Sequence, residues 1–342
     1  MTNTDVTLMR AALELARRGP VADPNPRVGA VVVGRDGHIV GTGFHRGAGT
    51  PHAEVVALAA AGDRARGATA VVTLEPCNHT GRTGPCSQAL LAAGVARVVY
   101  AQSDPHAAAA GGAQTLHTAG VRVEGGLLAA EAAELNQAWT FAMVSGRPRV
   151  VWKFAATLDG RSAAADGTSR WITGPAARAD VHLLRAQAGA VLVGTGTVLA
   201  DDPSLTVRNS DGELTGRQPL RVVMGRRRLP PDARVLDGSA PTLLLRESDP
   251  LAVLHELGQR EIRQVWLEGG PTLAAAFVRA GLVDEVIAYL APVLLGEGTS
   301  AVAGLGITTM DAALRLNPHD VTTLGPDVRV RATLLSPGQK GH

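Results

Sequence analysis

The sequence predicts an α/β fold that is divided into two domains. Short apolar runs typical of buried strands alternate with segments of helical spacing over residues 28–124. The same alternation begins again after residue 148, which indicates a second sheet covered by helices. The chain has 342 residues, of which 45% are hydrophobic, so each half is long and apolar enough to form its own core.

In the first half, residues 28–33 are a continuous, largely β-branched apolar run that ends at a Gly-Arg-Asp-Gly turn, so we expect a buried strand there. Residues 54–61 and 87–93 have apolar side chains at helical spacing. Gly94 follows the second of these helices, where glycine commonly ends a helix. Further strands are expected at residues 39–43, 68–74, 95–101 and 121–124.

The boundary between the domains is expected at Ser145-Gly-Arg-Pro148, because residues 128–144 have the spacing of one helix and a strand-like run follows at residues 150–155. We therefore expect domains at residues 1–146 and 147–342. In the second domain we expect strands at residues 190–193, 220–224, 242–245, 265–267 and 285–290, a helix at residues 273–280, and a polar surface loop at residues 209–216.

Charge and composition exclude several classes of partner. Lys and Arg total 33 and Asp and Glu total 31, and this net charge of +2 does not favour binding to nucleic acid or anionic lipid. Only 3% of the residues are aromatic, which leaves few surfaces for stacking single-stranded bases. No apolar run approaches the about 18 residues of a transmembrane helix. We therefore expect neither a nucleic-acid nor a membrane partner.

A cytoplasmic location is expected from two further observations. The start of the chain, Met1-Thr-Asn-Thr-Asp5, lacks the basic and apolar regions of a signal peptide. Two cysteines are too few for a disulfide scaffold and are consistent with a reducing compartment.

The first candidate site combines His52, Cys77 and Cys86 with Glu54. His52 and Glu54 stand at the opening of a predicted helix, Cys77 follows a predicted strand, and Cys86 opens the next helix. One imidazole and two thiolates make a three-ligand zinc set with an open fourth position, which is typical of catalytic zinc. Glu54 is two residues from a ligand, where its carboxylate could face metal-bound water without binding the metal. The alternative, two inert buried thiols and a surface histidine, does not explain this combination.

The zinc pattern resembles that of a known family. The segments His52-Ala-Glu54 and Leu74-Glu-Pro-Cys-Asn-His-Thr-Gly-Arg-Thr-Gly-Pro-Cys86 resemble the bacterial bifunctional riboflavin-biosynthesis proteins, in which a pyrimidine deaminase is fused to a reductase. Asp23-Pro-Asn-Pro-Arg-Val-Gly29 is similar to their N-terminal substrate loop. The resemblance implies a cytidine-deaminase-like three-layer α/β/α domain followed by a dihydrofolate-reductase-like α/β domain.

Two positions depart from the family pattern. Gly84-Pro-Cys86 stands where the family usually has Pro-Pro-Cys, which changes no metal ligand. Asp104-Pro-His106 stands where the family usually has Asp-Pro-Asn, which affects one substrate contact.

For the first domain, the resemblance implies zinc-dependent removal of the 2-amino group from a phosphoribosylaminopyrimidine. Glu54 would take a proton from the attacking water and return it to the departing ammonia. The substrate contacts that the resemblance implies are Asn25, His45, His79 and Asp104. The alternative for the two histidines is that they are solvated loop residues.

The second domain has a different cofactor pattern. No Gly-x-Gly-x-x-Gly follows a strand, so a Rossmann domain is not expected. A predicted strand at residues 265–267 leads through Gly269-Gly-Pro271 into a helix, whose first N–H groups could hold a phosphate. Any tight strand–helix turn could use the same residues, so this pattern is weak alone.

Four segments of the second half also resemble the reductase of the same family: residues 153–161, 171–174, 180–185 and 194–208. The resemblance implies that this domain uses NADPH to reduce the ribosyl group to ribityl. It implies NADPH contacts at Ala155, Trp171, Thr197, Asp201, Gly270, Pro271, Thr272, Leu273, Ala274, Ala275 and Ala276. It implies substrate contacts at Ser169, Arg185, Leu205, Arg208 and Glu268.

Several of these side chains have alternatives. Arg185 and Arg208 suit the ribose phosphate, but could form surface salt bridges instead. Lys153 could donate a proton to the opening sugar or pair with a phosphate or carboxylate, and Asp201 could be a turn residue. Arg226, in an Arg-Arg-Arg run after a predicted strand, could contact the 2′-phosphate of NADPH or belong to a solvated turn.

The expected protein is therefore a bifunctional enzyme, in a homo-oligomer, that binds zinc, NADPH and a small phosphoribosylaminopyrimidine. Two alternatives remain at this point. A tRNA-type zinc deaminase would leave the reductase segments unexplained. A non-catalytic, zinc-stabilised binding module would have no use for Glu54 or for an open metal position.

Overall fold

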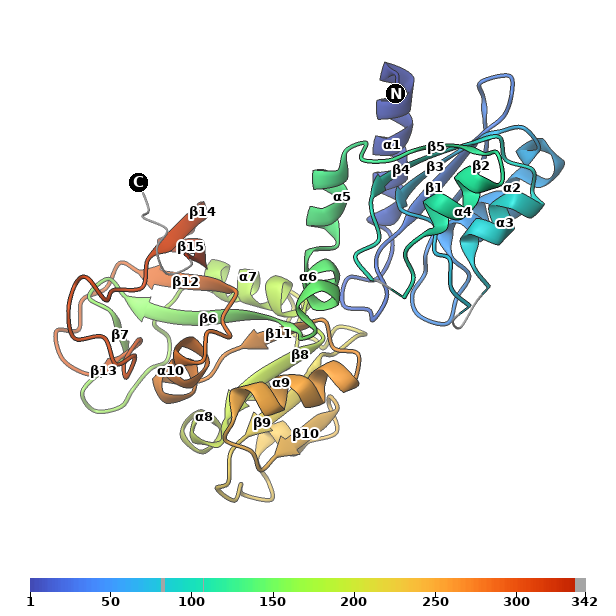
Figure 1. The fold of residues 1–342 in the computed structure, drawn as a ribbon. Helices are drawn as coiled ribbons and strands as arrows, with labels where there is room; N and C mark the ends of the chain where they lie inside the picture. The colour runs from blue at the N-terminus through green and yellow to red at the C-terminus, as the bar shows by residue number, and fades with distance from the viewer. Residues whose placement is uncertain (81–83, 107, 336–342) are drawn as a thin grey trace. The chain divides into compact units, whose positions relative to one another are not determined.

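The computed structural model describes residues 1–80, 84–106 and 108–335. The chain divides into two compact units, Met1–Gly146 and Arg147–His342, and Figure 1 shows their secondary structure in chain order. Gly81, Arg82 and Thr83 of the cysteine motif lie outside the described residues, as do residues 107 and 336–342. None of the helices in the described ranges is long and apolar enough to cross a membrane.

The first unit is a five-stranded sheet between two layers of helices, as expected for the α/β/α domain. The strand order is β2-β1-β3-β4-β5, with β1 antiparallel to both neighbours and β3, β4 and β5 parallel. The strands are β1 (Gly29–Val33), β2 (Ile39–Phe44), β3 (Thr69–Leu74), β4 (Arg97–Gln102) and β5 (Arg122–Glu124). The helices are α1 (Asn3–Ala16), α2 (Ala53–Ala61), α3 (Cys86–Ala92), α4 (Gly112–Thr118), α5 (Ala129–Leu135) and α6 (Gln137–Ser145).

Both faces of this sheet are buried because successive residues of a strand point to opposite sides. Val31 packs with α1 on one face, while Val32 packs with α2 on the other. Two glycines of β2 allow α2 to lie very close to the sheet. A Cβ at Gly41 or Gly43 would overlap backbone oxygens of α2, so these positions fix the helix that carries the first functional residues.

The prediction of one helix over residues 128–144 was wrong. The segment forms α5 and α6, which meet at Asn136. Asn136 leaves helical geometry, with φ −111° and ψ 24°, and its side chain bonds to a distant loop. Its Oδ1 accepts the N–H of Arg27 at 2.8 Å, and its Nδ2 donates to the Arg27 carbonyl at 3.0 Å. These two bonds compensate for the break in the helix.

The second unit is built on an eight-stranded sheet in the order β10-β9-β8-β11-β6-β12-β15-β14. The first six are parallel, and β15 is antiparallel to β12 and β14. They are β6 (Arg149–Thr157), β8 (Ala190–Gly194), β9 (Leu220–Met224), β10 (Thr242–Leu245), β11 (Gln264–Leu267), β12 (Glu285–Ala291), β14 (Leu316–Leu324) and β15 (Asp327–Leu334). The short strands β7 (Arg161–Ala163) and β13 (Thr299–Ser300) form a separate pair.

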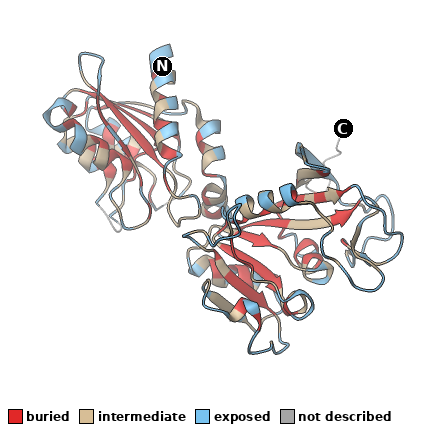
Figure 2. Ribbon diagram, turned by 180° about the vertical axis from the view of Figure 1, so that it is seen from behind, coloured by how far each residue is buried: buried red, intermediate tan, exposed pale blue. Residues whose placement is uncertain are grey.

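Helices cover both faces of the parallel part of this sheet. The helices α9 (Pro250–Gln259) and α10 (Pro271–Arg279) pack on one face through Leu254 and Phe277. On the other face α7 (Pro175–Arg185) and α8 (Thr195–Asp201) pack through Val181 and Val198. Central strands of both sheets are buried along most of their length (Figure 2). The carboxyl ends of the parallel strands thus form one edge, where α/β proteins commonly bind ligands.

Candidate active sites

The structure brings the three predicted metal ligands together in the first unit. His52 is the N-cap of α2, Cys86 is the first residue of α3, and Cys77 lies between β3 and α3. The Nδ1 atom of His52 is 3.2 Å from Sγ of Cys86 and 3.5 Å from Sγ of Cys77. Their ligand atoms all lie within 4.8 Å of one another, the only such group found among the described residues. One imidazole and two thiols at these separations fit zinc.

The electrostatics of the thiols also fit a bound cation. A hydrogen bond with Cys86 and another with His52 lower the pKa of Cys77 to about 4. The hydrogen bond with Cys77, together with burial, raises the pKa of Cys86. The pair alone therefore holds one negative charge, and a divalent cation would be needed to hold both sulfurs as thiolates.

Glu54 lies beside this cluster on the first turn of α2 and is only 5% exposed. Burial raises the pKa of its carboxyl group, and the charge of Cys77 raises it further. Glu54 does not belong to the ligand group. A buried carboxyl group with a raised pKa is suited to taking up and releasing a proton near neutral pH.

Asn25 and His45 form a hydrogen-bonded pair near the ligands. Nδ1 of His45 is 3.2 Å from the Pro51 carbonyl, which can only accept, so Nδ1 carries the proton. Nε2 of His45 then accepts from Nδ2 of Asn25 at 3.0 Å. His45 is 4% exposed, and burial lowers its pKa. The bond to Pro51 fixes the imidazole, and Nε2 then orients Asn25, whose Oδ1 stays available as an acceptor.

His79 and Asp104 extend the same site. Nδ1 of His79 is buried without a hydrogen-bond partner among the described residues, and the His79 and His106 rings are 6.3 Å apart. Oδ1 of Asp104 accepts the N–H of His106 at 2.8 Å. Burial raises the pKa of Asp104, and the charge of Cys77 adds to this effect. His106 therefore shapes the loop that holds Asp104 through its backbone.

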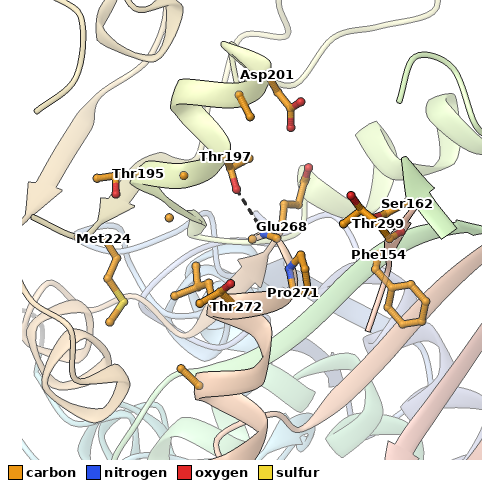
Figure 3. A pocket seen from close by; sticks show the side chains of 18 of the residues that line it. Phe154, Ser162, Thr195, Thr197, Asp201, Met224, Glu268, Pro271, Thr272 and Thr299 are labelled. Atoms are coloured by element: carbon orange, nitrogen blue, oxygen red, sulfur yellow. Dashed lines mark hydrogen bonds between the residues drawn. The ribbon is translucent and has the colours of Figure 1, made fainter. Parts of the chain in front are cut away.

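The second unit contains a cavity of about 730 Å³ at the carboxyl ends of its parallel strands (Figure 3). The predicted residues that line it are Lys153, Ala155, Ser169, Thr197, Asp201, Glu268, Gly270, Pro271, Thr272, Leu273 and Ala276. Ala274 and Ala275 point into the core instead, with 1% of their surface exposed. Four further residues line the cavity that the sequence did not predict as contacts: Phe154, Ser162, Glu247 and Thr299. Phe154 lies in the reductase-like segment 153–161, and the other three lie in no cofactor motif.

The cavity has the features that a dinucleotide needs. Gly269 and Gly270 line the cavity before α10. A Cβ at Gly269 would overlap the Leu273 side chain, whereas a Cβ at Gly270 would approach only Oγ1 of Thr197, at 3.9 Å. The N–H of Gly270 donates to Oγ1 of Thr197 at 3.3 Å, the bond drawn in Figure 3. The N–H groups of the first helical turn have no intrahelical acceptor and face an anion favourably. These residues fit the pyrophosphate of NADPH.

Lys153 and Glu268 lie together on the cavity wall. Arg185 binds both carboxylate oxygens of Glu268, at 2.7 and 2.9 Å, and Trp266 donates to Oε1. Although burial alone would raise the pKa of Glu268, the charges of Arg185 and Lys153 lower it to about 2. Burial lowers the pKa of Lys153. The negative charge of Glu268 raises this pKa, and the positive charge of Arg185 lowers it. Lys153 can therefore give up its proton more readily than an exposed lysine.

Several of the predicted reductase contacts have other partners in this structure or lie outside the cavity lining. Nη1 of Arg185 donates to the Thr206 carbonyl at 2.6 Å, so in this arrangement Arg185 orients Glu268. The Arg208 guanidinium donates to the Gly212 carbonyl at 2.7 Å. Trp171, Leu205, Arg208 and Arg226 are not among the residues that line the cavity.

The two sites define a class of protein: a zinc-dependent deaminase joined to a dinucleotide-dependent reductase. Family models agree, since residues 2–102 match the cytidine and deoxycytidylate deaminase zinc-binding region and residues 148–330 match the RibD C-terminal domain. The chain belongs to the RibD family of riboflavin biosynthesis proteins.

Individual relatives cover nearly the whole chain. It is 52% identical to riboflavin biosynthesis protein RibD of Mycobacterium tuberculosis, over 89% of this chain and 90% of that one. It is 45% identical to RibD of Escherichia coli, over 95% of this chain and 98% of that one. The solved structure of Acinetobacter baumannii RibD is 43% identical, with a TM-score of 0.89 over 97% and 99% of the two chains.

The protein is therefore a bifunctional deaminase and reductase of riboflavin biosynthesis, and its cofactors are zinc and NADPH. This excludes the two alternatives of a nucleic-acid deaminase and a non-catalytic zinc module. The predicted cytidine-deaminase-like and reductase folds are confirmed.

Proposed function

We propose that the first unit deaminates 2,5-diamino-6-(5-phosphoribosylamino)pyrimidin-4(3H)-one, and that the second reduces the ribosyl group of 5-amino-6-(5-phosphoribosylamino)uracil to ribityl. A solved structure from Thermotoga maritima, 32% identical with a TM-score of 0.86 over 97% of this chain and 99% of that one, is of a diaminohydroxyphosphoribosylaminopyrimidine deaminase/5-amino-6-(5-phosphoribosylamino)uracil reductase. The observation that carries the proposal is the buried Glu54 beside His52, Cys77 and Cys86.

In the deaminase, His52, Cys77 and Cys86 hold zinc, which supplies the Lewis acidity that makes water a nucleophile near neutral pH. Glu54 accepts a proton from that water on its carboxylate. The remaining hydroxide adds to the carbon that carries the 2-amino group, the C–N bond breaks, and Glu54 returns the proton to the amino group, which leaves as ammonia. Asn25, fixed by His45, presents Oδ1 as an acceptor for a ring N–H or amino group.

In the reductase, NADPH supplies the hydride when bound. Nζ of Lys153 donates a proton to the ring oxygen of the ribose as the sugar opens. Glu268, held by Arg185, keeps Lys153 charged until this transfer. Both groups line the cavity, so they can reach the sugar carbon that accepts the hydride.

We also propose that the protein is cytoplasmic and forms a homo-oligomer. Its only two cysteines are free and belong to the metal site, which suits a reducing compartment. The second unit exposes large apolar side chains between β12 and the end of β14, including Leu294, Met310 and Val321. Association of copies would cover apolar side chains of this kind, which supports the proposal.

The test is to incubate the protein with the diaminopyrimidine phosphate, with and without NADPH, and to identify the products by mass spectrometry. Without NADPH, we expect only the deaminated ribosyl compound. With NADPH, we expect the deaminated ribityl compound. Consumption of NADPH without deamination, or no change in either mixture, would contradict the proposal.

A further inference from the structure

Arg227 is the middle residue of the arginine run in which Arg226 was the predicted contact for the 2′-phosphate of NADPH. It follows β9 at the carboxyl edge of the sheet and lines the cavity, whereas Arg226 and Arg228 do not. Its guanidinium lies over the start of α8, because a Cβ at Gly196 would be 2.6 Å from Nη2 of Arg227. Arg227 makes no hydrogen bond or ion pair with the described residues. Its charge is thus available for a ligand in the cavity.

The order of the strands indicates which part of NADPH lies near Arg227. Lys153 is on β6 and Arg227 follows β9, three strands away, a separation of about 14 Å across the sheet. The glycine turn after β11 lies between them. In Figure 3, Met224 and Thr195 are on the opposite side of the cavity from Phe154 and Ser162. With nicotinamide beside Lys153 and pyrophosphate on the glycine turn, the adenosine ribose reaches Arg227.

The charges on the cavity wall support the same placement. Among the described residues that line the cavity, only Lys153 and Arg227 are cationic, and Lys153 faces Glu268. Glu247, after β10, also lines the Arg227 end, and its Oε1 accepts the N–H groups of Ser248 and Asp249 at 2.6 and 3.0 Å. A carboxylate at such a place suits a ribose 2′-hydroxyl, while an arginine suits a 2′-phosphate. Discrimination between NADPH and NADH therefore depends on Arg227.

We propose that Arg227 binds the 2′-phosphate of NADPH and is the residue that selects NADPH over NADH. The planar guanidinium forms two parallel hydrogen bonds with a phosphate, which an ammonium group cannot reproduce. This inference rests on the NADPH-dependent reduction described above and assigns the preference to one residue of the arginine run.

Binding measurements test the assignment independently of catalysis. Dissociation constants are measured by calorimetry for NADPH, NADH, adenosine 2′,5′-bisphosphate and 5′-AMP. For Arg227→Gln we expect an about tenfold to hundredfold loss of affinity for NADPH and the bisphosphate, with NADH and 5′-AMP unchanged. Arg227→Lys should retain part of the preference. Arg228→Gln, the matched control, removes the same charge one position away and should keep the parent's preference.

Three results would overturn the inference. Arg227→Gln could discriminate between NADPH and NADH as the parent does. Arg226→Gln or Arg228→Gln could lose as much affinity as Arg227→Gln, which would indicate a diffuse charge effect. The parent could bind neither dinucleotide, in which case the reductase assignment fails together with this one. Binding of NADH and 5′-AMP with the parent's affinity shows that the second unit of each variant is folded.

Discussion

Replacing Glu268 by Gln should destabilise the second unit in a pH-dependent way. The substitution keeps the shape of the side chain but removes the charge that faces Arg185. The pKa of Glu268 is about 2 in the folded protein, against an ordinary value of 4.5. At about 1.4 kcal/mol for each unit of pKa, this difference corresponds to about 3 kcal/mol of stability. Because the carboxylate is largely buried, with 12% of its side chain exposed, solvent screens this interaction only weakly.

The sign of the pH dependence follows from the lowered pKa. The contribution of Glu268 is complete above pH 4.5 and is lost as the pH falls from 4.5 through about 2. The parent should therefore melt about 6–12 °C above Glu268→Gln at pH 7. The gap should shrink steadily below pH 4.5.

Differential scanning calorimetry of the whole chain measures this gap between pH 3 and pH 8. Glu297→Gln is the control, since Glu297 is an exposed glutamate of the same unit, and its melting temperature should match the parent's. A gap of the same size at pH 3 and pH 7, or no gap at pH 7, would show that the Glu268–Arg185 pair does not stabilise the fold.

Three further predictions concern the two activities. Cys77→Ala should lose both its zinc and its deaminase activity, because the two remaining ligands hold the metal poorly. A zinc content that stayed at one per chain, measured by atomic absorption, would contradict this prediction. Glu54→Gln should keep its zinc but lose about 10⁴-fold or more of the deamination rate, since Glu54 moves a proton twice in each turnover; a near-normal rate would assign the proton to another group. Lys153→Met should deaminate normally and fail to reduce. A mixture of Lys153→Met and Glu54→Gln should therefore complete both steps. Failure of the mixture would show that the deaminated intermediate does not pass from one molecule to another.

The central, buried strands and the metal site were predictable because both depend on local patterns. Apolar runs such as residues 28–33 lie in strands that are buried on both faces, and β1 occupies five of those six positions. Cys86 opens α3, His52 precedes α2, and Cys77 lies in the short segment that leads from β3 to α3, so the three side chains meet. The order of residues and elements along the chain is therefore enough to predict most of the metal site.

Features that depend on distant partners could not be predicted in this way. The helix break at Asn136 exists because its amide bonds to Arg27, which is 109 residues away in the chain. Arg185 appears in sequence as a free cation, but its Nε and Nη2 donate to Glu268, 83 residues away, and its Nη1 donates to the Thr206 carbonyl. The outer strand β14 is mostly exposed and has no continuous apolar face, so its sequence resembles a loop.

The close contact between β2 and α2 has a consequence for how substitutions would be tolerated. Any side chain at Gly41 or Gly43 would displace α2 as a whole, and with it His52 and Glu54. A saturation screen for loss of deamination should therefore find these two glycines to be as intolerant as the metal ligands, although neither has a side chain with which to touch the substrate. The surrounding exposed positions, such as Ile39, should accept many residues. The positions most sensitive to substitution would thus include two in the middle of β2, a strand that supplies no catalytic side chain.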